Sequence, residues 1–337
     1  MVFISFFLVG LLTFFITTFL LKWVPNGFLD QPTSVRKRHV TAIPCVGGVA
    51  FVIAILLMAY IFDYLSVHYL WYACGGSLIF LLGLIDDRWG LSWYAKLLIE
   101  GFVGVSIFLF LKGHSDLSFL FGVFSEYSYL HIFLWIFWFL GMVNAVNLTD
   151  GLDGLAAGLV CLSVIGAGVF GFMPFQLMVV AALLVFLFFN RFPAKIYMGD
   201  CGSLFLGYHL AVTPLLFSFS VSTSFSLIAY LMMGTYFIWD TVRVVVLRMM
   251  LGGNPFKPDQ KHFHFVLLRY TQSKLLTVTL LYALHGYFVF CGVLFVVFNH
   301  SIWIFSMYLI GLAFLIGIPF LEPILKRNRL VWRKKQL

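Results

Sequence analysis

Charged side chains are scarce in this sequence. Of its 337 residues, 10% are Asp, Glu, Lys or Arg, whereas 62% are hydrophobic and 19% are aromatic. A water-soluble domain carries about 25% charged residues, so a chain this apolar cannot surround its core with a hydrated surface. The composition excludes an ordinary soluble enzyme and indicates an integral membrane protein.

Cysteine is also rare, and the pattern of a cleavable signal peptide is missing. The five cysteines are odd in number and lie mostly inside apolar runs, which argues against a disulfide framework. The first basic residue, Lys22, follows the apolar stretch 2–21 instead of preceding it. We therefore expect a retained first membrane helix with its N-terminus outside.

Long apolar runs are plentiful, whereas internal repeats and low-complexity linkers are lacking. A membrane-spanning helix needs about 20 mostly apolar residues, and these runs are too long and continuous for the strands of a β-barrel. We predict an all-α integral membrane protein, with residues 1–337 as a single polytopic domain of about eleven transmembrane helices. The predicted spans are 2–21, 43–62, 69–85, 93–111, 129–147, 154–172, 174–190, 203–219, 222–246, 275–298 and 302–325.

The basic residues agree with one orientation of these spans. With the N-terminus outside, the C-terminus is cytoplasmic, and so are the loops 22–42, 86–92, 148–153, 191–202 and 247–274. All 21 Lys and Arg except Lys112 lie in these segments, in the tail from 326 or at adjoining helix ends, as the positive-inside rule requires. The net charge of +8 therefore marks topology and contacts with anionic lipid or phosphate, and we expect no nucleic acid partner.

Two adjacent carboxylates follow the third predicted span. Asp86 and Asp87 in GLIDDRWG repel each other, so we expect one of them to have a raised pKa or to share a cation. Either state suits a general base or a metal ligand. A solvated helix end with Arg88 as partner explains them equally well. Lys96, at the start of the next helix, is either a membrane anchor or a member of the same pocket.

The segment NAVNLTDGLDG is unusually polar for the end of a membrane helix. Asn147, Asp150 and Asp153 are spaced i, i+3, i+6, which places them on one helical face, and Asn144 extends the row. Their oxygen atoms suit Mg²⁺. A helix cap with turn glycines is the plainer alternative, but polar groups near lipid are usually functional.

A glycine-rich loop, MGDCGS, carries Asp200 between Gly199 and Gly202. Glycines let backbone N–H groups approach a phosphate, and the aspartate can take a cation. As a single motif this pattern is weak.

The loop PFKPDQKHFHF contains two histidines, His262 and His264. In an extended segment they would point the same way and could hydrogen-bond a pyrophosphate. They could also bind zinc with a third ligand, but no cysteine or third histidine stands at a zinc-site spacing.

A basic cluster, RKRH, precedes the second span. Arg36 and His39 are explained either as part of a positive-inside cluster or as a clamp for a lipid or nucleotide phosphate.

Taken in order, these segments resemble the polyprenyl-phosphate N-acetylhexosamine-1-phosphate transferases, most nearly the bacterial branch that uses undecaprenyl phosphate and UDP-N-acetylglucosamine. The matching segments are DQP, RKRH, IPCVGG, DDR, NAVNLTDGLDGL, MGDCGS and PFKPDQKHFH. The resemblance implies a multi-pass enzyme of the bacterial inner membrane with its active site on the cytoplasmic face. It would transfer N-acetylhexosamine-1-phosphate from a UDP-sugar to undecaprenyl phosphate and release UMP, starting a cell-envelope glycan.

The resemblance also implies a role for each candidate residue. Asn147 and Asp200 would hold Mg²⁺ or Mn²⁺, and Asp86 and Asp87 would activate or position the lipid phosphate. The substrate-binding residues would be Lys96, Asp150, Asp153, Lys261, His262, His264, Arg36 and His39. The expected partners are a UDP-N-acetylhexosamine, undecaprenyl phosphate, membrane lipids and a second copy in a homodimer. We favour direct displacement because the acceptor phosphate is already a nucleophile.

The sequence departs from the family pattern at three points. The stretch from Asp30 to Arg36 is one residue longer, Gln260 replaces an arginine, and Phe265 replaces the last histidine. Lys261 could compensate for the lost contact. The enzymes that transfer phospho-MurNAc-pentapeptide usually carry adjacent histidines in this loop, and HFHF argues against that substrate.

Two other functions stay open. A secondary transporter would place ionisable groups near the bilayer midplane on broken helices, often with internal repeats, whereas these acids cluster at helix ends on one side. A catalytically inactive relative that serves as a scaffold would not need to retain the six polar residues from Asp86 to Asp200.

Overall fold

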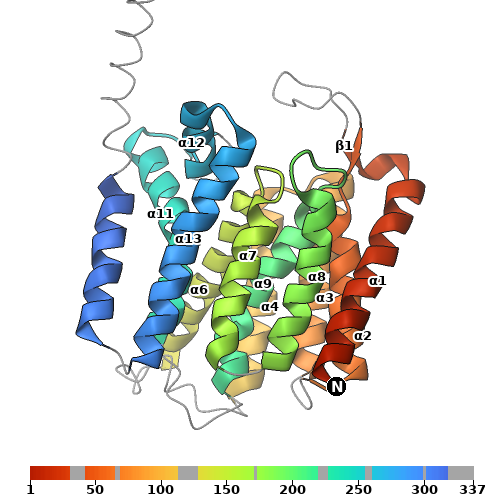
Figure 1. The fold of residues 1–337 in the computed structure, drawn as a ribbon, viewed down its shortest axis with the longest axis horizontal. Helices are drawn as coiled ribbons and strands as arrows, with labels where there is room; N and C mark the ends of the chain where they lie inside the picture. The colour runs from red at the N-terminus through yellow and green to blue at the C-terminus, as the bar shows by residue number, and fades with distance from the viewer. Residues whose placement is uncertain are drawn as a thin grey trace, which may run out of the picture.

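The structure, a computed structural model, describes residues 1–30, 42–64, 69–112, 128–170, 173–218, 227–254, 260–298 and 301–317. The described chain is almost entirely helical, and most helices stand side by side in one bundle (Figure 1). The helices are α1 (Val2–Trp23), α2 (Gly47–Ile61), α3 (Tyr69–Trp89), α4 (Trp93–Lys112), α6 (Ser128–Thr149), α7 (Leu155–Ala167), α8 (Met173–Asn190), α9 (Gly199–Ser218), α10 (Leu227–Met233), α11 (Thr235–Met250), α12 (Phe263–Thr271), α13 (Lys274–Val297) and a last helix over Ile302–Gly317. Short 3-10 helices cover Asn26–Phe28 and Gly168–Phe170, and two-residue strands β1 (Leu29–Asp30) and β2 (Ile43–Pro44) pair antiparallel.

Several of these helices have the length and composition of membrane spans. Among the described residues, five helices are long and apolar enough to cross a bilayer: Val2–Trp23, Leu70–Trp89, Trp93–Phe110, Tyr129–Thr149 and Lys274–Val297. Shorter apolar helices cover Gly47–Ile61, Leu155–Ala167, Pro174–Asn190 and Ile302–Gly317. Large apolar side chains such as Phe3, Phe102 and Phe137 point outward, which a soluble protein rarely tolerates over so wide a surface. The all-α prediction is confirmed.

Helix α9 lies at the centre of the bundle. It packs against α2, α3, α6 and α7, and every residue from 201 to 216 is buried. A helix that is apolar on all sides belongs in a core, and the polar groups of α9 are paired there: His209 lies 2.9 Å from the hydroxyl oxygen of Tyr72 and 3.2 Å from Oε1 of Gln176. Because α9 begins at Gly199, its burial fixes the position of Asp200 at one end of the bundle.

Some element boundaries differ from the prediction. The loop expected at 86–92 starts later, because α3 continues to Trp89 and carries the two adjacent aspartates in its last turns. The predicted span 222–246 is interrupted at Gly234, where α10 ends and α11 begins. The loop predicted at 247–274 contains α12. These differences follow from tertiary contacts and capping, which apolar run lengths do not report.

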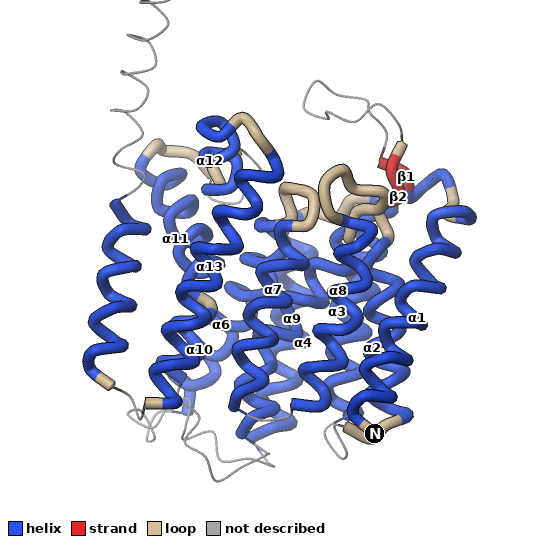
Figure 2. Tube along the Cα trace, in the orientation of Figure 1, coloured by secondary structure: helices blue, strands red, loops and turns tan. Residues whose placement is uncertain are grey.

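Two sequence motifs meet through their backbones at the same end as Asp200. The amides of Gly47 and Gly48 donate to the carbonyl oxygens of Tyr197 and Met198, each at 2.8 Å, and the amide of Tyr197 donates to Pro44 O at 2.8 Å. IPCVGG thus holds the loop before α9. Figure 2 shows several loops, the two strands and α12 at this end, with the N-terminus at the other.

Candidate active site

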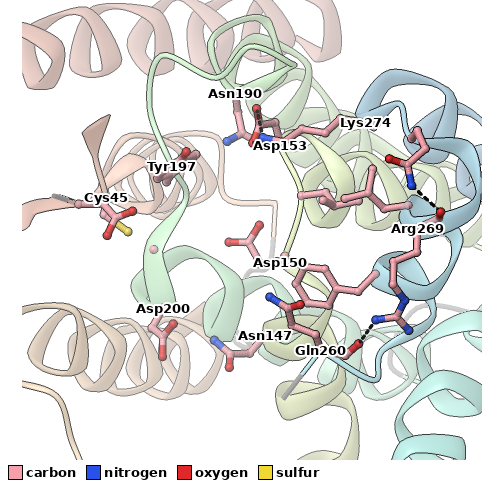
Figure 3. A pocket seen from close by; sticks show the side chains of 17 residues that line it. Cys45, Asn147, Asp150, Asp153, Asn190, Tyr197, Asp200, Gln260, Arg269 and Lys274 are labelled. Carbon is pink, nitrogen blue, oxygen red and sulfur yellow. Dashed lines mark hydrogen bonds and ion pairs between the residues drawn. The ribbon is translucent and has the colours of Figure 1, made fainter. Parts of the chain in front are cut away.

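One polar cavity lies where α6 and α8 end and α7 and α9 begin (Figure 3). Its volume is about 460 Å³, within the usual range for small-molecule sites. It is lined by Asp30, Cys45, Asn147, Asp150, Gly151, Leu152, Asp153, Asn190, Tyr197, Gly199, Asp200, Gln260, Phe265, Leu268, Arg269, Gln272 and Lys274. The excess of aspartates over basic side chains suits a cation or an anionic ligand bound through a cation.

Lys96 joins two of the predicted site carboxylates beside this cavity. Its ammonium nitrogen lies 2.7 Å from Oδ2 of Asp86 and 3.2 Å from Oδ2 of Asp200. The three side chains come from α4, α3 and α9, and all three are partly shielded from water, which strengthens the attraction over that of a surface ion pair. The ammonium therefore holds together two acids that would otherwise repel.

Asp87, the neighbour of Asp86, faces the first turn of α9. Its Oδ1 accepts a hydrogen bond from the amide of Asp200 at 2.8 Å, and its Oδ2 accepts one from the amide of Cys201 at 3.0 Å. The first amides of a helix have no partner within the helix, and the helix dipole favours a negative charge there. Asp87 thus fixes where α9 begins. These two amides bind a carboxylate of the protein and not a phosphate.

Two glycines allow α3 and α9 to come this close. A Cβ atom on Gly83 would overlap the backbone of Asp200, and one on Gly199 would overlap the carboxylate of Asp87. Gly199 also has a φ of +76°, a conformation that glycine adopts at little cost. The glycines in LLGLIDD and MGDCGS therefore serve the helix contact that positions the acids.

Asn147, in the last turn of α6, stands next to the same part of α9. Its Nδ2 donates to Ser203 Oγ at 2.9 Å, and Ser203 Oγ donates to Gly199 O at 3.2 Å. This bond sets the rotation of the amide and leaves Oδ1 as its free acceptor. Asn147 and Asp200 both line the cavity (Figure 3).

These donors suit Mg²⁺ better than zinc. Mg²⁺ prefers one or two protein oxygens and completes its shell with substrate phosphates and water. Asn147 Oδ1 and the Asp200 carboxylate match that set. A structural zinc site needs several Cys or His side chains close together. Over the described residues, no three His, Cys, Asp or Glu side chains come close enough together to hold a metal ion.

Asp150 and Asp153 do not continue a helical face from Asn147, so that prediction was wrong. Helix α6 ends at Thr149, and both aspartates lie in the turn before α7, which starts after Gly154 in the left-handed region with a φ of +80°. Glycine in this conformation ends one helix and redirects the chain to the next. Both carboxylates nevertheless line the cavity, so their nearness to Asn147 was predicted correctly but its cause was not.

The environment of Asp150 disfavours its charge. Partial removal from water raises the pKa of this carboxyl to about 7, and the negative charges of Asp200, Asp87 and Asp153 add to the effect. Asp150 therefore changes its protonation state near neutral pH, and a cation bound in the cavity would favour the carboxylate.

Asp153 braces three segments around the cavity. Its carboxylate lies 3.3 Å from Nζ of Lys274 at the start of α13 and accepts a hydrogen bond from the amide of Ala194 at 3.3 Å. Nearby, Asn190 accepts from the amide of Gly154 at 3.0 Å. The turn after α6, the loop before α9 and α13 are thus linked through side chains, which gives the cavity a fixed rim.

Helix α12 forms the wall opposite Asp200, Cys45 and Tyr197 (Figure 3). Phe265, Leu268, Arg269 and Gln272 line the cavity at the i, i+3, i+4, i+7 spacing of one helical face. Arg269 donates to the carbonyl oxygen of Gln260 at 3.2 Å.

Both departures from the family pattern in this loop, Gln260 and Phe265, therefore lie on the cavity wall. Lys261, which we expected to compensate, is not among the lining residues, whereas Arg269 is.

The two predicted histidines lie behind this wall and not on it. His262 and His264 are 4% and 0% exposed. Their segment is not extended: His262 precedes α12 and His264 is in its first turn, and the rings stack at 5.8 Å with an interplanar angle of 15°. Burial lowers the pKa of His264 to about 3, so this ring is neutral at physiological pH. Arg36 and His39 lie outside the described residues.

Sequence reasoning missed one buried acid beneath the site. Glu100 in α4 is fully buried and accepts a hydrogen bond from Nδ2 of Asn144, which also donates to Leu140 O at 3.0 Å. Glu100 sits one helical turn after Lys96. The signal was present in the sequence as the lone acid within the apolar run 93–111, where a carboxylate is costly.

Comparison with known proteins identifies the class. Residues 69–218, which contain Asp86, Lys96, Asn147 and Asp200, match the model of glycosyl transferase family 4. Together with the apolar helices this defines a multi-pass membrane glycosyl-1-phosphotransferase.

Full-length relatives extend the match. The chain is 35% identical over 324 residues to a probable undecaprenyl-phosphate N-acetylglucosaminyl 1-phosphate transferase of Bacillus subtilis, covering 90% of this chain and 87% of the relative. It is 31% identical over 262 residues to the undecaprenyl-phosphate alpha-N-acetylglucosaminyl 1-phosphate transferase of Escherichia coli, covering 72% and 70%. It is also 32% identical over 249 residues to a phospho-N-acetylmuramoyl-pentapeptide-transferase of Streptococcus pneumoniae, covering 66% and 74%. The chain belongs to glycosyl transferase family 4.

Proposed function

We propose that this chain transfers N-acetylglucosamine-1-phosphate from UDP-N-acetylglucosamine to undecaprenyl phosphate and so starts a lipid-linked glycan. The observation that carries the proposal is the shared cavity of Asn147, Asp150 and Asp200 next to the Asp86–Lys96 pair. The relatives in B. subtilis and E. coli bear names for this reaction and are 35% and 31% identical. Enzymes of the family typically use Mg²⁺, and the oxygen donors in the cavity suit that ion.

Four of these residues have a proposed task in the reaction. An oxygen of the lipid phosphate attacks the β-phosphorus of the UDP-sugar, a new P–O bond forms, and the bond to UMP breaks as UMP leaves. Asn147 and Asp200 hold Mg²⁺, which neutralises the diphosphate when bound. Lys96 offers a cation to the acceptor phosphate and keeps Asp86 in place. Asp87 keeps Asp200 in place through the first turn of α9.

We further propose that the cavity opens to the cytoplasm, where UDP-sugars are made. The gathering of Arg88, Lys96, Arg191, Lys195 and Lys274 at the cavity end supports this orientation. The opposite end of the bundle carries the N-terminus (Figure 1).

The competing substrate is UDP-MurNAc-pentapeptide, because the S. pneumoniae relative is about as similar to this chain as the E. coli relative. Sequence identity therefore does not choose the sugar. Phe265 on the cavity wall supports the smaller substrate, since an apolar ring offers a peptide-bearing sugar no hydrogen bond.

UMP release by the purified protein tests the proposal. The assay contains undecaprenyl phosphate and Mg²⁺, with UDP-GlcNAc, UDP-GalNAc or UDP-MurNAc-pentapeptide supplied separately. We expect UMP from UDP-GlcNAc alone, dependent on both lipid and metal. The variant Asp200→Asn should release none while keeping the thermal unfolding curve of the wild type. Release that persists in this variant would remove Asp200 from the metal site, and no release from any sugar would favour the transporter or scaffold functions.

A further inference from the structure

A buried carboxylate, Asp240, lies outside the cavity and anchors its α12 wall. It belongs to α11 and is 1% exposed. Its Oδ2 accepts from Nδ1 of His262 at 2.9 Å, while its Oδ1 accepts from the amide of Phe263 at 2.9 Å and from Nη2 of Arg243 at 2.8 Å. A charge removed from water is costly unless it is fully paired, and here both oxygens are used.

The same cluster holds the backbone just before α12. Nη2 of Arg243 also donates to the carbonyl oxygen of Lys261 at 2.6 Å. Residues 261–263 are thus attached to α11 by three groups: the Lys261 carbonyl, the His262 ring and the Phe263 amide. These residues lead into α12. Their attachment therefore fixes the position of the side chains from Phe265 to Gln272 that line the cavity.

The His262 ring is connected through His264 to the turn between α6 and α7 that carries Asp150. The His264 ring stacks on that of His262 and presses against Gly151, where a Cβ atom would overlap Nε2 of His264. Within the described chain, Nε2 of His262 and both ring nitrogens of His264 have no hydrogen-bond partner. Gly151 directly follows Asp150. Asp240, His262, His264 and Gly151 therefore form a continuous column between α11 and the cavity.

We propose that Asp240 is a positioning residue for the nucleotide-sugar: through this column it sets the distance between the α12 wall and the Asp150 turn. The proposal deepens the proposed function and rests on it for the identity of the ligand. The two walls enclose the cavity that would hold the UDP-sugar, whereas the Asp86–Lys96 pair lies on α3 and α4, outside the column. Binding of the lipid phosphate should therefore not depend on Asp240.

The first test compares Michaelis constants for the two substrates in Asp240→Asn. The amide keeps the shape of the side chain but loses one acceptor and the negative charge. We expect the KM for UDP-GlcNAc to rise about tenfold, as for loss of a charged hydrogen bond, while the KM for undecaprenyl phosphate stays within about twofold of the wild type. The matched control is Asp63→Asn, because Asp63 follows the end of α2 that lies opposite Gly47. This variant should change neither Michaelis constant. An unchanged KM for UDP-GlcNAc, or an equal rise in both constants, would overturn the proposal.

The second test needs no substrate and stands even if the wild type releases no UMP. Gly151→Ala should lower the thermal unfolding midpoint in detergent by several degrees, because the added Cβ atom would overlap the His264 ring. In a His264→Ala background, Gly151→Ala should lower the midpoint by less than half as much, because the overlapping ring is gone. In an Asp240→Asn background, Gly151→Ala should also lower the midpoint by less, because the rings of His262 and His264 are then free to shift. Strictly additive effects of these substitutions would show that the column does not connect α11 to the turn.

Discussion

Oδ1 of Asp87 accepts a hydrogen bond from the amide of Asp200 at 2.8 Å, so an acid of α3 fixes the first turn of α9. Asp87→Ala would leave the amides of Asp200 and Cys201 unsatisfied. We expect it to lower the free energy of unfolding by about 2–6 kcal/mol, at roughly 1–3 kcal/mol for each of the two buried amides. It should also lower UMP release strongly, because Asp200 moves with the helix end. Chemical unfolding in detergent and the UMP assay measure the two effects.

Asp87→Asn distinguishes this role from general-base chemistry. The amide keeps one acceptor, so the stability should be intermediate between those of the wild type and Asp87→Ala. If Asp87 acts by position, turnover of the two variants should follow their stability. A fully stable Asp87→Asn protein without turnover would instead assign Asp87 a direct chemical task.

Lys96 stands where it can compete with a metal ion for Asp200, 3.2 Å from its carboxylate. Lys96→Met should lower kcat by at least about tenfold, because a charged hydrogen bond worth about 1.5–3 kcal/mol is lost. The same variant should bind Mg²⁺ more tightly, since the ammonium no longer repels the ion.

Lys96→Arg keeps the charge and is the matched control. It should retain the Mg²⁺ affinity of the wild type. Titration with Mn²⁺ followed by electron paramagnetic resonance measures the affinity apart from turnover. Weaker metal binding in Lys96→Met would show that the ammonium supports the metal site and does not compete with it.

Loss of the hydrogen bond from Asn147 to Ser203 should change the Mg²⁺ requirement for UMP release less severely than Lys96→Met changes turnover. Ser203→Ala removes the acceptor at 2.9 Å that orients the amide, while the methyl group keeps the packing of α9. The Mg²⁺ concentration for half-maximal UMP release should rise about three- to tenfold, corresponding to about 0.5–1.5 kcal/mol for one neutral hydrogen bond. Ser306 lies in the last described helix and donates to Ile302 O at 2.9 Å, and Ser306→Ala should leave this concentration unchanged. Equal values for the two variants would remove Ser203 from the site.

Much of the fold could be predicted because a bilayer imposes about 20 apolar residues on each spanning helix. The boundaries that failed have local causes. Asp86 and Asp87 are polar, but they extend α3 because α9 and Lys96 supply partners for them. The break at Gly234 lies in an apolar run with no charge to mark it. Run length reports burial in lipid and not where a helix bends.

Four of the predicted site residues, Asn147, Asp150, Asp153 and Asp200, line one cavity, but the contacts of these residues could not be predicted. Carboxylates near lipid are costly, and this singled out Asp150 and Asp200 without any structure. The contacts that organise them join positions more than a hundred residues apart, such as Lys96 with Asp200 and Asp153 with Lys274. Chain spacing carries no information about such contacts. The predicted helical face failed for a local reason, because α6 ends at Thr149 and the glycines of the following turn redirect the chain into α7.

The pKa of Asp150, raised to about 7, predicts a pH-dependent metal affinity. Below pH 7 this carboxyl is neutral and attracts a cation weakly; above pH 7 it is charged and attracts it strongly. If protonation and metal binding exclude each other, Mg²⁺ affinity should rise about tenfold from pH 6 to pH 8. Calorimetric titration in buffers of different ionisation enthalpy would detect the proton released on binding near pH 7. Burial also raises the pKa of Asp200 to about 7, so in Asp150→Asn both the rise and the proton release should decrease but not vanish, whereas Asp63→Asn should keep them in full. A pH-independent affinity in the wild type would mean that the carboxylate of Asp150 does not sense the metal, and its place on the cavity wall would then serve the sugar or the uridine alone.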